Sequence, residues 1–488
     1  MLFNSLSYIL VFLPFVFFSY LYLTKNNHFV SAKILLLLSS IFFYGMWKPK
    51  YVSLLILSLI INYAIGTQLK QVKHRKIFLI VGIVINVGIL CFFKYTYFLI
   101  ENMNYIAGTS FHVSEYILPL AISFFTFEQI TYLFYCYNSN TVSLLDYSLF
   151  ITFFPKLIAG PILYPEEMIP QYVNKENKTI DARNIEAGLN LFFTGLFKKV
   201  VIADTLAAVA INGYDKMGEL TMITSWATAL SYTLQLYYDF SGYTDMARGA
   251  ALLFNIHLPF NFDSPYKSTN IQEFWRTWHI TLSRFLRKYI YIPLGGNKIS
   301  GSKTYLNLIT VFLIGGLWHG AGWTFILWGL LHGVAMAVNR MWQTTEHKMN
   351  KYLGWFLTFN FVNITWVFFR AKDFSAVVKI LTGMSGYYEI REILATRELN
   401  LNMIIAALKN SLHNFRLTFD SAASYYYYIF ILAGSLIFSI FFKNTNSISK
   451  DKVPSYTDTF TFLVLTIVSM VYVFYDINVS KPFLYFNF

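Results

Sequence analysis

Long apolar runs without charge recur along most of this chain, and they limit what it can fold into. Of its 488 residues, 56% are hydrophobic, 19% are aromatic and only 13% are charged. Inside a bilayer the backbone finds no water to hydrogen-bond, so a segment that crosses the hydrocarbon core must satisfy its own amides, as a helix does. We therefore expect an all-α, polytopic transmembrane protein with about 11–13 helices.

The apolar segments differ in length, and several are shorter than the roughly 20 residues that a perpendicular span requires. We expect the short ones to be tilted, re-entrant or broken helices buried within protein. Together the segments predict a single membrane domain over residues 1–488. They are Leu2–Leu23, Ile34–Trp47, Tyr51–Leu69, Ile77–Phe93, Tyr116–Tyr137, Tyr147–Leu163, Gly188–Ala203, Met222–Tyr238, Tyr305–Leu317, Trp323–Val338, Trp355–Phe369, Tyr425–Phe442 and Phe460–Tyr475.

The net charge of +13 has two interpretations. In a soluble protein it would suggest nucleic acid, whereas in a membrane protein lysines and arginines collect in cytoplasmic loops near anionic lipid headgroups. The second fits the composition, so we expect contacts with membrane lipids and none with nucleic acid. The basic loop Lys70–Lys76 is predicted to be cytoplasmic. Counting back across three spans places the N-terminus outside, together with Lys48 and Lys50.

Two segments are amphiphilic rather than apolar. Residues 261–303 carry arginines and lysines among aromatic residues, which predicts a re-entrant or interfacial helix pair. Residues 371–424 mix charge with short apolar runs and predict an interfacial or extramembrane insert. Cys91 and Cys136 lie in apolar segments, and we expect small buried side chains without a disulfide.

The segment Gly315–Trp323 places a histidine, His319, among apolar and aromatic residues. An ionisable side chain is costly at membrane depth, so such a histidine is a candidate functional residue. Imidazole can take a proton from a hydroxyl group and later return it. His319 is therefore a candidate general base, and the alternative is a core histidine that is hydrogen-bonded to a helix carbonyl.

Indole rings and guanidinium groups alternate around a second histidine, His279, in Phe274–Arg284. Arginine binds phosphate well and indole can stack on adenine, which favours a nucleotide-bearing ligand. The alternative is an interfacial aromatic belt with arginines that extend to the headgroups. The candidate ligand-binding residues are Trp275, Arg276, Trp278, Arg284 and Arg287.

The remaining histidines are less distinctive. We expect His257 and His332 to be hydrogen-bonded packing residues, and His112 and His413 to lie in loops. The chain has no H-E-x-x-H pair, no G-x-S-x-G elbow and no P-loop, so a metal site, a serine hydrolase and ATP-driven transport are not indicated.

A further patch, Tyr237–Arg248, interrupts an apolar run with Asp239, Asp245 and Arg248. Within a membrane such groups pair with each other or face a cavity. A structural polar latch and a role in lining a site therefore both stay open.

Several motifs, taken in order, resemble the membrane-bound O-acyltransferases, in particular the bacterial branch that O-acetylates polysaccharides and peptidoglycan. The resemblance covers most of residues 115–375, and it departs from the family at Ala121, usually glycine, and at Tyr135–Asn138, usually Asp-Val-Tyr-Arg. The motifs are Leu118–Phe127, Phe153–Ile162, Gly195–Asp204, Tyr237–Tyr243, Phe274–Arg284, Ile292–Asn297, Leu317–Gly320 and Trp366–Ala371.

The resemblance implies a set of expectations about mechanism. His319 corresponds to the catalytic histidine of the family and His279 to its second histidine. The helices are expected to surround a tunnel through the bacterial inner membrane, with acetyl-coenzyme A as the cytoplasmic donor substrate and no bound cofactor. An esterase-like periplasmic partner protein is expected to relay acetyl to an extracytoplasmic glycan.

Two other functions stay open. A lysophospholipid acyltransferase would use a long-chain donor. A proton-coupled transporter or channel would use the histidines as a proton relay, but the inverted-repeat pattern typical of many transporters is not evident.

Overall fold

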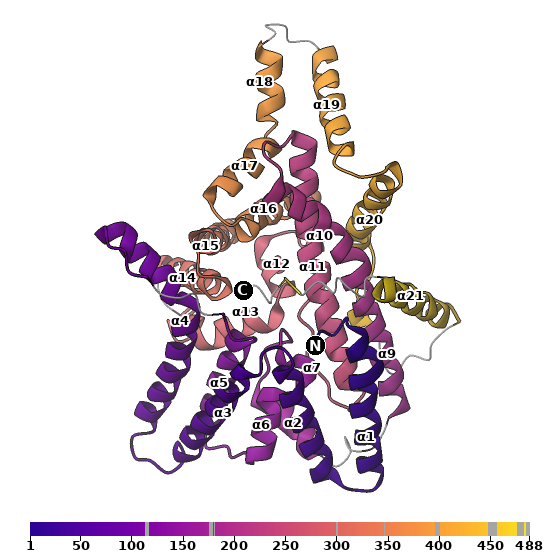
Figure 1. Cartoon of the computed structure of the whole chain (residues 1–488). Helices are drawn as coiled ribbons and strands as arrows, with labels where there is room; N and C mark the ends of the chain where they lie inside the picture. Colours follow the sequence, from indigo (N-terminus) through magenta and orange to yellow (C-terminus); the bar gives the residue numbers. More distant parts are fainter. Residues whose placement is uncertain are drawn as a thin grey trace. The chain divides into compact units, whose positions relative to one another are not determined.

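The computed structural model describes residues 1–112, 117–174, 179, 181–298, 301–345, 347–395, 401–447, 456–475 and 483–484. Regular structure within these residues is helical throughout, which confirms the prediction of an all-α chain (Figure 1). Five of the described helical segments are long and apolar enough to cross a membrane, as a multi-pass membrane protein requires. They are Ser7–Lys25, Lys50–Gln68, Arg75–Ala107, Lys351–Arg370 and Ala422–Phe441. The larger number of spans expected from the sequence stays a prediction.

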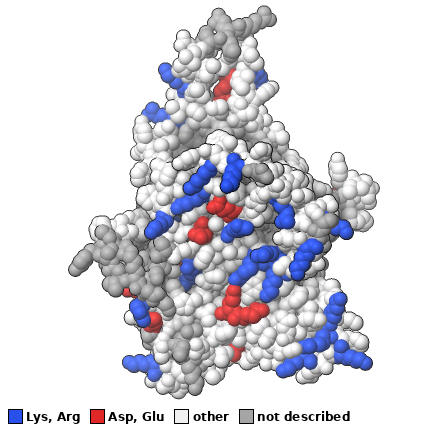
Figure 2. Space-filling model, turned by 180° about the vertical axis from the view of Figure 1, so that it is seen from behind, with Lys and Arg blue, Asp and Glu red and all other residues white. Residues whose placement is uncertain are grey.

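The exposed surface suits a bilayer. On the face in Figure 2 the Lys and Arg side chains lie in separate groups, and wide areas between them carry no charged side chain. Large apolar side chains such as Phe15, Phe18 and Leu38 are more than half exposed on their helices. Lipid chains cover such side chains at little cost, whereas water does not.

The chain divides into two compact units whose segments alternate along the sequence. The first comprises residues 1–197, 241–261 and the described part of 445–488, and the second comprises residues 198–240 and 262–444. The helix α11 (Met222–Leu252) contributes residues to both units.

The first unit is built from apolar helices joined by short polar turns. The turn that follows α1 and the basic turn that follows α3 lie at the same end of this unit in Figure 1, as three consecutive spans before a cytoplasmic loop require. Its helices are α1 (Leu13–Lys25), preceded by a π-helical segment Ser7–Phe12, α2 (Phe29–Gly45), α3 (Lys50–Gln68), α4 (Arg75–Ala107), α5 (Ile122–Tyr137), α6 (Leu144–Thr152), α7 (Phe154–Leu157), α8 (Pro165–Val173), α9 (Ala182–Phe197) and α21 (Tyr456–Tyr475).

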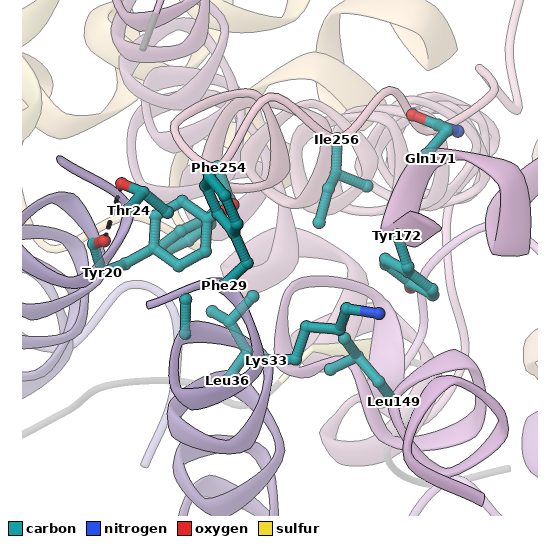
Figure 3. A pocket seen from close by; sticks show the side chains of 11 residues that line it. Tyr20, Thr24, Phe29, Lys33, Leu36, Leu149, Gln171, Tyr172, Phe254 and Ile256 are labelled. Atoms are coloured by element: carbon teal, nitrogen blue, oxygen red, sulfur yellow. Dashed lines mark hydrogen bonds between the residues drawn. The ribbon is translucent and has the colours of Figure 1, made fainter. Parts of the chain in front are cut away.

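A cavity lies in the first unit, near the turn between α1 and α2 (Figure 3). Its wall includes Lys33, Tyr172 and Phe254. The Lys33 ammonium lies 2.5 Å from Oδ1 of Asp146, so its charge is neutralised by that carboxylate.

The predicted segment Tyr147–Leu163 is not one helix. It contains the end of α6 and the short α7, and residues 158–164 are not helical. Pro155 at the start of α7 has no amide hydrogen with which to extend the bonding of α6. This agrees with the expectation that the short apolar segments include broken helices, and Pro155 marks the position of the break.

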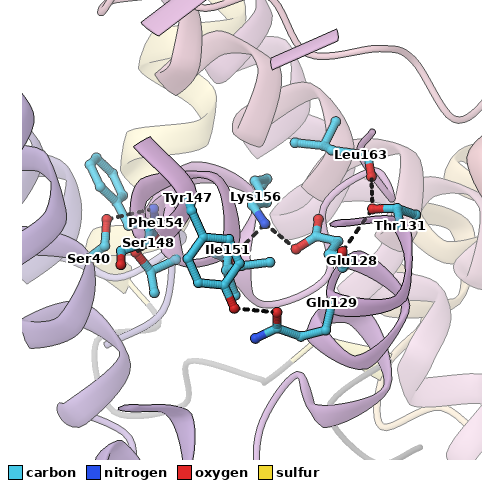
Figure 4. A network of polar contacts seen from close by, with 11 residues as sticks. Ser40, Glu128, Gln129, Thr131, Tyr147, Ser148, Ile151, Phe154, Lys156 and Leu163 are labelled. Atoms are coloured by element: carbon cyan, nitrogen blue, oxygen red, sulfur yellow. Dashed lines mark hydrogen bonds and ion pairs between the residues drawn. The ribbon is translucent and has the colours of Figure 1, made fainter. Parts of the chain in front are cut away.

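This break places a charged pair in the interior of the first unit (Figure 4). The Lys156 ammonium donates to a carboxylate oxygen of Glu128 and, at 2.8 Å, to the Ile151 carbonyl. The side chains of Lys156 and Glu128 are 1% and 4% exposed. Tyr147 donates to the side-chain oxygen of Gln129 at 2.6 Å in the same network. Two opposite charges at this depth are tolerable because each satisfies the other.

The second unit holds the motifs with the two candidate histidines. Its described helices are α10 (Asp204–Ile211), the first part of α11, α12 (Ile271–Thr277), α13 (Ile280–Leu286), α14 (Gly301–His319), α15 (Trp323–Gln343), α16 (Lys351–Arg370), α17 (Phe374–Met384), α18 (Tyr387–Ala395), α19 (Leu401–Arg416) and α20 (Ala422–Phe441). The pair α12 and α13 matches the short helices expected within residues 261–303, of which 299 and 300 lie outside the described residues.

The patch Tyr237–Arg248 lies within the continuous helix α11. In the second unit, Asp239 accepts a hydrogen bond from Lys199 at 2.6 Å. In the first unit, Asp245 accepts one from the Thr445 hydroxyl at 2.8 Å. Both carboxylates are paired, which favours the polar latch over the site-lining role.

Three details differ from the sequence-based expectations. Cys136 is buried, but Cys91 is exposed on α4, because this helix buries only one of its faces. His257 is exposed rather than packed, and its backbone amide donates to Gln171 Oε1 at 2.8 Å. His413 lies in α19 and not in a loop.

Ala121 occupies a backbone position that favours glycine. Its φ angle is 61°, in the left-handed region where a Cβ atom is strained. This geometry gives a physical reason for the glycine that the resembled family usually has there.

Candidate active site

His319 is the last residue of α14, at a sharp connection to α15. The connection runs through Gly320, where a Cβ atom would overlap the ring of Phe325. Bulky side chains are also excluded where the two helices cross, because a Cβ on Gly316 would overlap the Phe325 carbonyl and one on Gly329 the Phe312 carbonyl. Small residues thus let α14 and α15 pack closely, as they do between membrane helices generally.

The His319 ring is 3% exposed and is surrounded by aromatic rings. The centroids of Trp318, Trp328 and Phe369 lie 4.9, 5.2 and 5.0 Å from its own. The rings of Trp328 and Phe369 meet it edge to face, at interplanar angles of 89° and 72°. These contacts limit the rotation of the imidazole and exclude water from its faces.

His279 lies at the junction of α12 and α13, where the chain turns sharply. Its φ and ψ angles are 43° and 53°, a left-handed conformation that is unusual for a residue with a side chain. Such strain persists only where the surrounding structure enforces it, and it is concentrated at functional sites. The residue is fully buried, with the Phe240 ring centroid 4.8 Å away.

The structure brings the two histidines together. Their ring centroids are 6.5 Å apart, and the Trp318 ring contacts both. His279 lies outside the five candidate spans, and burial lowers its pKa to about 3. It is therefore neutral at physiological pH, and a neutral imidazole can donate or accept a hydrogen bond without introducing a buried charge.

Comparison with known proteins identifies the family to which this site belongs. A sequence profile described as MBOAT, the membrane-bound O-acyltransferase family, matches residues 35–372. The chain belongs to the membrane-bound O-acyltransferase family. The matched region contains both histidines, and the chain is therefore an O-acyltransferase.

Three relatives of this acyltransferase show how far the similarity extends. The peptidoglycan O-acetyltransferase of Helicobacter pylori is 42% identical, over 100% of this chain and 98% of its own length. The probable alginate O-acetylase AlgI of Pseudomonas aeruginosa is 38% identical, over 79% of this chain and 75% of its own. The teichoic acid D-alanyltransferase of Streptococcus thermophilus is 25% identical, over 51% of this chain and 68% of its own.

The predicted ligand-binding residues of this O-acyltransferase fall into two groups. Trp275 and Trp278 are buried within a cluster of aromatic rings, 8% and 1% exposed. Arg276 and Arg287 are exposed and Arg284 is half-buried. Arg276 and Arg287 thus lie at the surface, whereas the indoles pack against other side chains of the protein.

The motif Trp366–Ala371 also lies at the site, although no role was predicted for its individual residues. The segment Trp366–Ala371 contributes Phe369 to the wall around His319, and the adjoining Arg370 pairs with Asp215 at 2.5 Å. Burial alone would raise the pKa of Asp215, but the hydrogen bond and charge of Arg370, aided by Lys372, outweigh it and lower this pKa below 3.8. The ion pair therefore anchors the end of α16 that carries Phe369.

His332 is a packing histidine, as expected. It is fully buried, lies one helical turn after Trp328, and is hydrogen-bonded through both ring nitrogens. Its partners are Trp275 and Thr365, which belong to α12 and α16.

Proposed function

We propose that this O-acyltransferase transfers acetyl groups from cytoplasmic acetyl-coenzyme A toward the hydroxyl groups of peptidoglycan, outside the inner membrane and by way of a periplasmic partner protein. The observation that carries the proposal is the buried pair of histidines, 6.5 Å apart and enclosed by aromatic rings. A neutral imidazole can accept a proton from an alcohol, and before the reaction it places no charge in the interior of the protein at membrane depth.

The identity of the glycan rests on the extent of the similarity. The relative named for peptidoglycan matches along this whole chain, including residues 373–488 beyond the family profile. The relatives named for alginate match over about four fifths of it, at lower identity. The match along the whole length favours peptidoglycan over an alginate-like polymer.

The chemistry follows from the properties of imidazole. His319 takes the proton from the acceptor hydroxyl as its oxygen bonds to the thioester carbonyl carbon. The tetrahedral intermediate then collapses, the carbon–sulfur bond breaks, and the thiolate leaves. His319 returns the proton to that sulfur, so one thioester and one alcohol give one ester and one thiol.

His279 has a different role in this scheme. Its ring lies across the site from His319, and a neutral imidazole N–H there can donate to the carbonyl oxygen of the thioester. Such a donor stabilises the negative charge that develops on this oxygen. Exposed Arg276 and Arg287 and half-buried Arg284 would bind the phosphates of the donor.

Cells that lack the gene provide the test of the acceptor. They are complemented with the wild type or with His319→Ala, and the acetate that mild base releases from purified peptidoglycan and from other surface polysaccharides is measured. We expect the peptidoglycan acetate to disappear without the wild-type gene. Unchanged peptidoglycan acetate together with altered phospholipid acylation would instead support the lysophospholipid acyltransferase.

A labelling experiment tests the route of the donor. A cysteine is introduced at Lys298, which is exposed, in a background that lacks Cys91 and Cys136. If the donor enters from the cytoplasm, this cysteine should react with an impermeant reagent in inverted vesicles and not in intact spheroplasts. Labelling in spheroplasts would overturn the orientation.

A further inference from the structure

His332 is a fully buried ionisable group that the proposed reaction does not use. Trp275 Nε1 lies 3.2 Å from its Nδ1, and Thr365 Oγ1 lies 3.0 Å from its Nε2. Thr365 Oγ1 in turn donates to the Val362 carbonyl at 2.9 Å. Four groups from three helices therefore form one hydrogen-bonded chain.

The chemistry of the two ends fixes where the protons lie. An indole N–H can only donate, so Nδ1 of His332 must accept and cannot carry a proton. The proton of the neutral ring is then on Nε2, which donates to Thr365 Oγ1. The hydroxyl hydrogen of Thr365 is directed to the Val362 carbonyl. All the hydrogen bonds in this series therefore point the same way, from Trp275 to the Val362 carbonyl. A second proton on His332 would break the bond from Trp275.

Each of the three helices that contribute to this hydrogen-bonded series also carries or adjoins a residue of the histidine site. Thr365 is one turn before Phe369 on α16, and His332 is one turn after Trp328 on α15. The rings of Phe369 and Trp328 both contact His319. Trp275 lies on α12, and His279 comes two residues after the end of this helix.

We propose that His332, held as its Nε2–H tautomer between Trp275 and Thr365, is a positioning residue that sets His279 and the rings around His319 in their places. It carries no proton for the reaction. Trp275 is then part of this support and does not stack on the donor's adenine.

The first test measures the tautomer and does not depend on acetyl transfer. The protein is labelled with ¹⁵N-histidine in lipid bilayers, and the His332 signals are assigned by their loss in His332→Asn. We expect a single neutral form with the proton on Nε2, unchanged from mildly acidic to mildly basic pH. In Trp275→Phe, which keeps an aromatic ring but removes the donor, the Nδ1–H form should appear as well. A charged His332, or an Nδ1–H form in the wild type, would overturn the proposal.

The second test is kinetic and rests on the proposed function. With acetyl-coenzyme A as the probe, Thr365→Val should lower kcat about 10-fold with little change in KM. Misplaced histidine rings stabilise the transition state less well, while substrate binding is little affected. Thr365→Ser keeps the hydroxyl and should restore most of the rate. Equal loss in the two variants would mean that packing, and not the hydrogen bond, is what matters at this position.

Trp275→Phe separates support from donor binding. We expect it to lower kcat and leave KM for acetyl-coenzyme A unchanged, and its effect should not add to that of Thr365→Val, since both act through one chain. A raised KM with an unchanged tautomer would show that Trp275 binds the donor and would overturn its assignment here. If the wild type has no acetyl-transfer activity, the proposed function fails, while the tautomer measurement still decides the role of His332.

Discussion

Two buried clusters of ionisable side chains, one in each unit, meet the cost of burial in different ways. In the first unit Glu128 and Lys156 carry opposite charges and neutralise each other. In the second unit His279 and His319 lie among aromatic rings, and imidazole avoids the cost because it can be neutral. A paired charge is locked in place, whereas a neutral imidazole stays reactive. This difference supports the proposal that the first cluster stabilises the fold and the second takes part in the reaction.

The largest effect is expected at His319. The substitution His319→Ala should reduce O-acetylation about 10²–10⁴-fold, the usual contribution of a general base, without lowering the amount of protein in the membrane. Cell-wall acetate and membrane protein level are measured in the same strain. Normal acetate at normal protein level would remove His319 from the chemistry and erase the contrast between the clusters.

Substitutions in the Glu128–Lys156 pair should lower the stability of the protein and should not act on the chemical step. Replacing Lys156 with Met leaves a buried carboxylate without its partner and should cost about 3–5 kcal/mol of unfolding free energy. The double variant Glu128→Leu/Lys156→Met should regain most of this loss. Unfolding of the purified protein in detergent gives both values.

A matched control for that pair is Lys33, whose bond to Asp146 is more exposed, with side chains 18% and 10% accessible. Lys33→Met should cost less than Lys156→Met, because Asp146 keeps the hydrogen bond from the Ser143 hydroxyl and its side chain stays partly accessible. If Lys33→Met and Lys156→Met were equally destabilising, burial would not be the reason for the effect.

His279→Ala should impair acetyl transfer strongly but less than His319→Ala, by up to about 10²-fold, because orientation is lost while the base remains. The reaction rate with acetyl-coenzyme A measures it. If His279→Ala had no effect on the rate, the alternative interpretation of this segment as an interfacial aromatic belt would be supported.

The smallest expected effect concerns Asp215. Its folded-state pKa is lowered, so the stability it provides is complete above its ordinary pKa of 3.8 and is lost as the pH falls through the folded value. Asp215→Asn should lower the free energy of unfolding by about 1 kcal/mol at neutral pH. On acidification the variant should lose less stability than the wild type, because it has no carboxylate to protonate at this position. Asp373→Asn, which keeps a side chain able to cap α17, is the matched control and should change little.

The sequence predicts the helices and singles out the two histidines because both depend on local signals; the catalytic role of the histidines stays a prediction. Apolar runs mark membrane helices, and His319 is conspicuous among apolar residues. The supporting contacts have no such signal, because the partners are far apart in the chain. Trp275 and His332 are 57 residues apart, and Asp215 and Arg370 are 155 apart.

The same limit applies to the polar groups inside the helices. Pro155 shows in the sequence that Tyr147–Leu163 can break, but the partner of the adjoining Lys156, Glu128, lies 28 residues earlier and could not be predicted. For the polar patch Tyr237–Arg248 the sequence left two roles open, because the partner of Asp239, Lys199, lies 40 residues earlier in the chain.

The central claim is that the buried histidine pair moves acetyl from a thioester on one side of the membrane to an acceptor on the other. The direct measurement uses the purified protein in sealed vesicles, sorted so that residue 298 faces outward, with labelled acetyl-coenzyme A outside and the partner protein with peptidoglycan fragments inside. We predict labelled ester inside and free thiol outside for the wild type, and neither for His319→Ala. Labelled ester formed equally by His319→Ala, or by the wild type only when donor and acceptor share one side, would contradict the account.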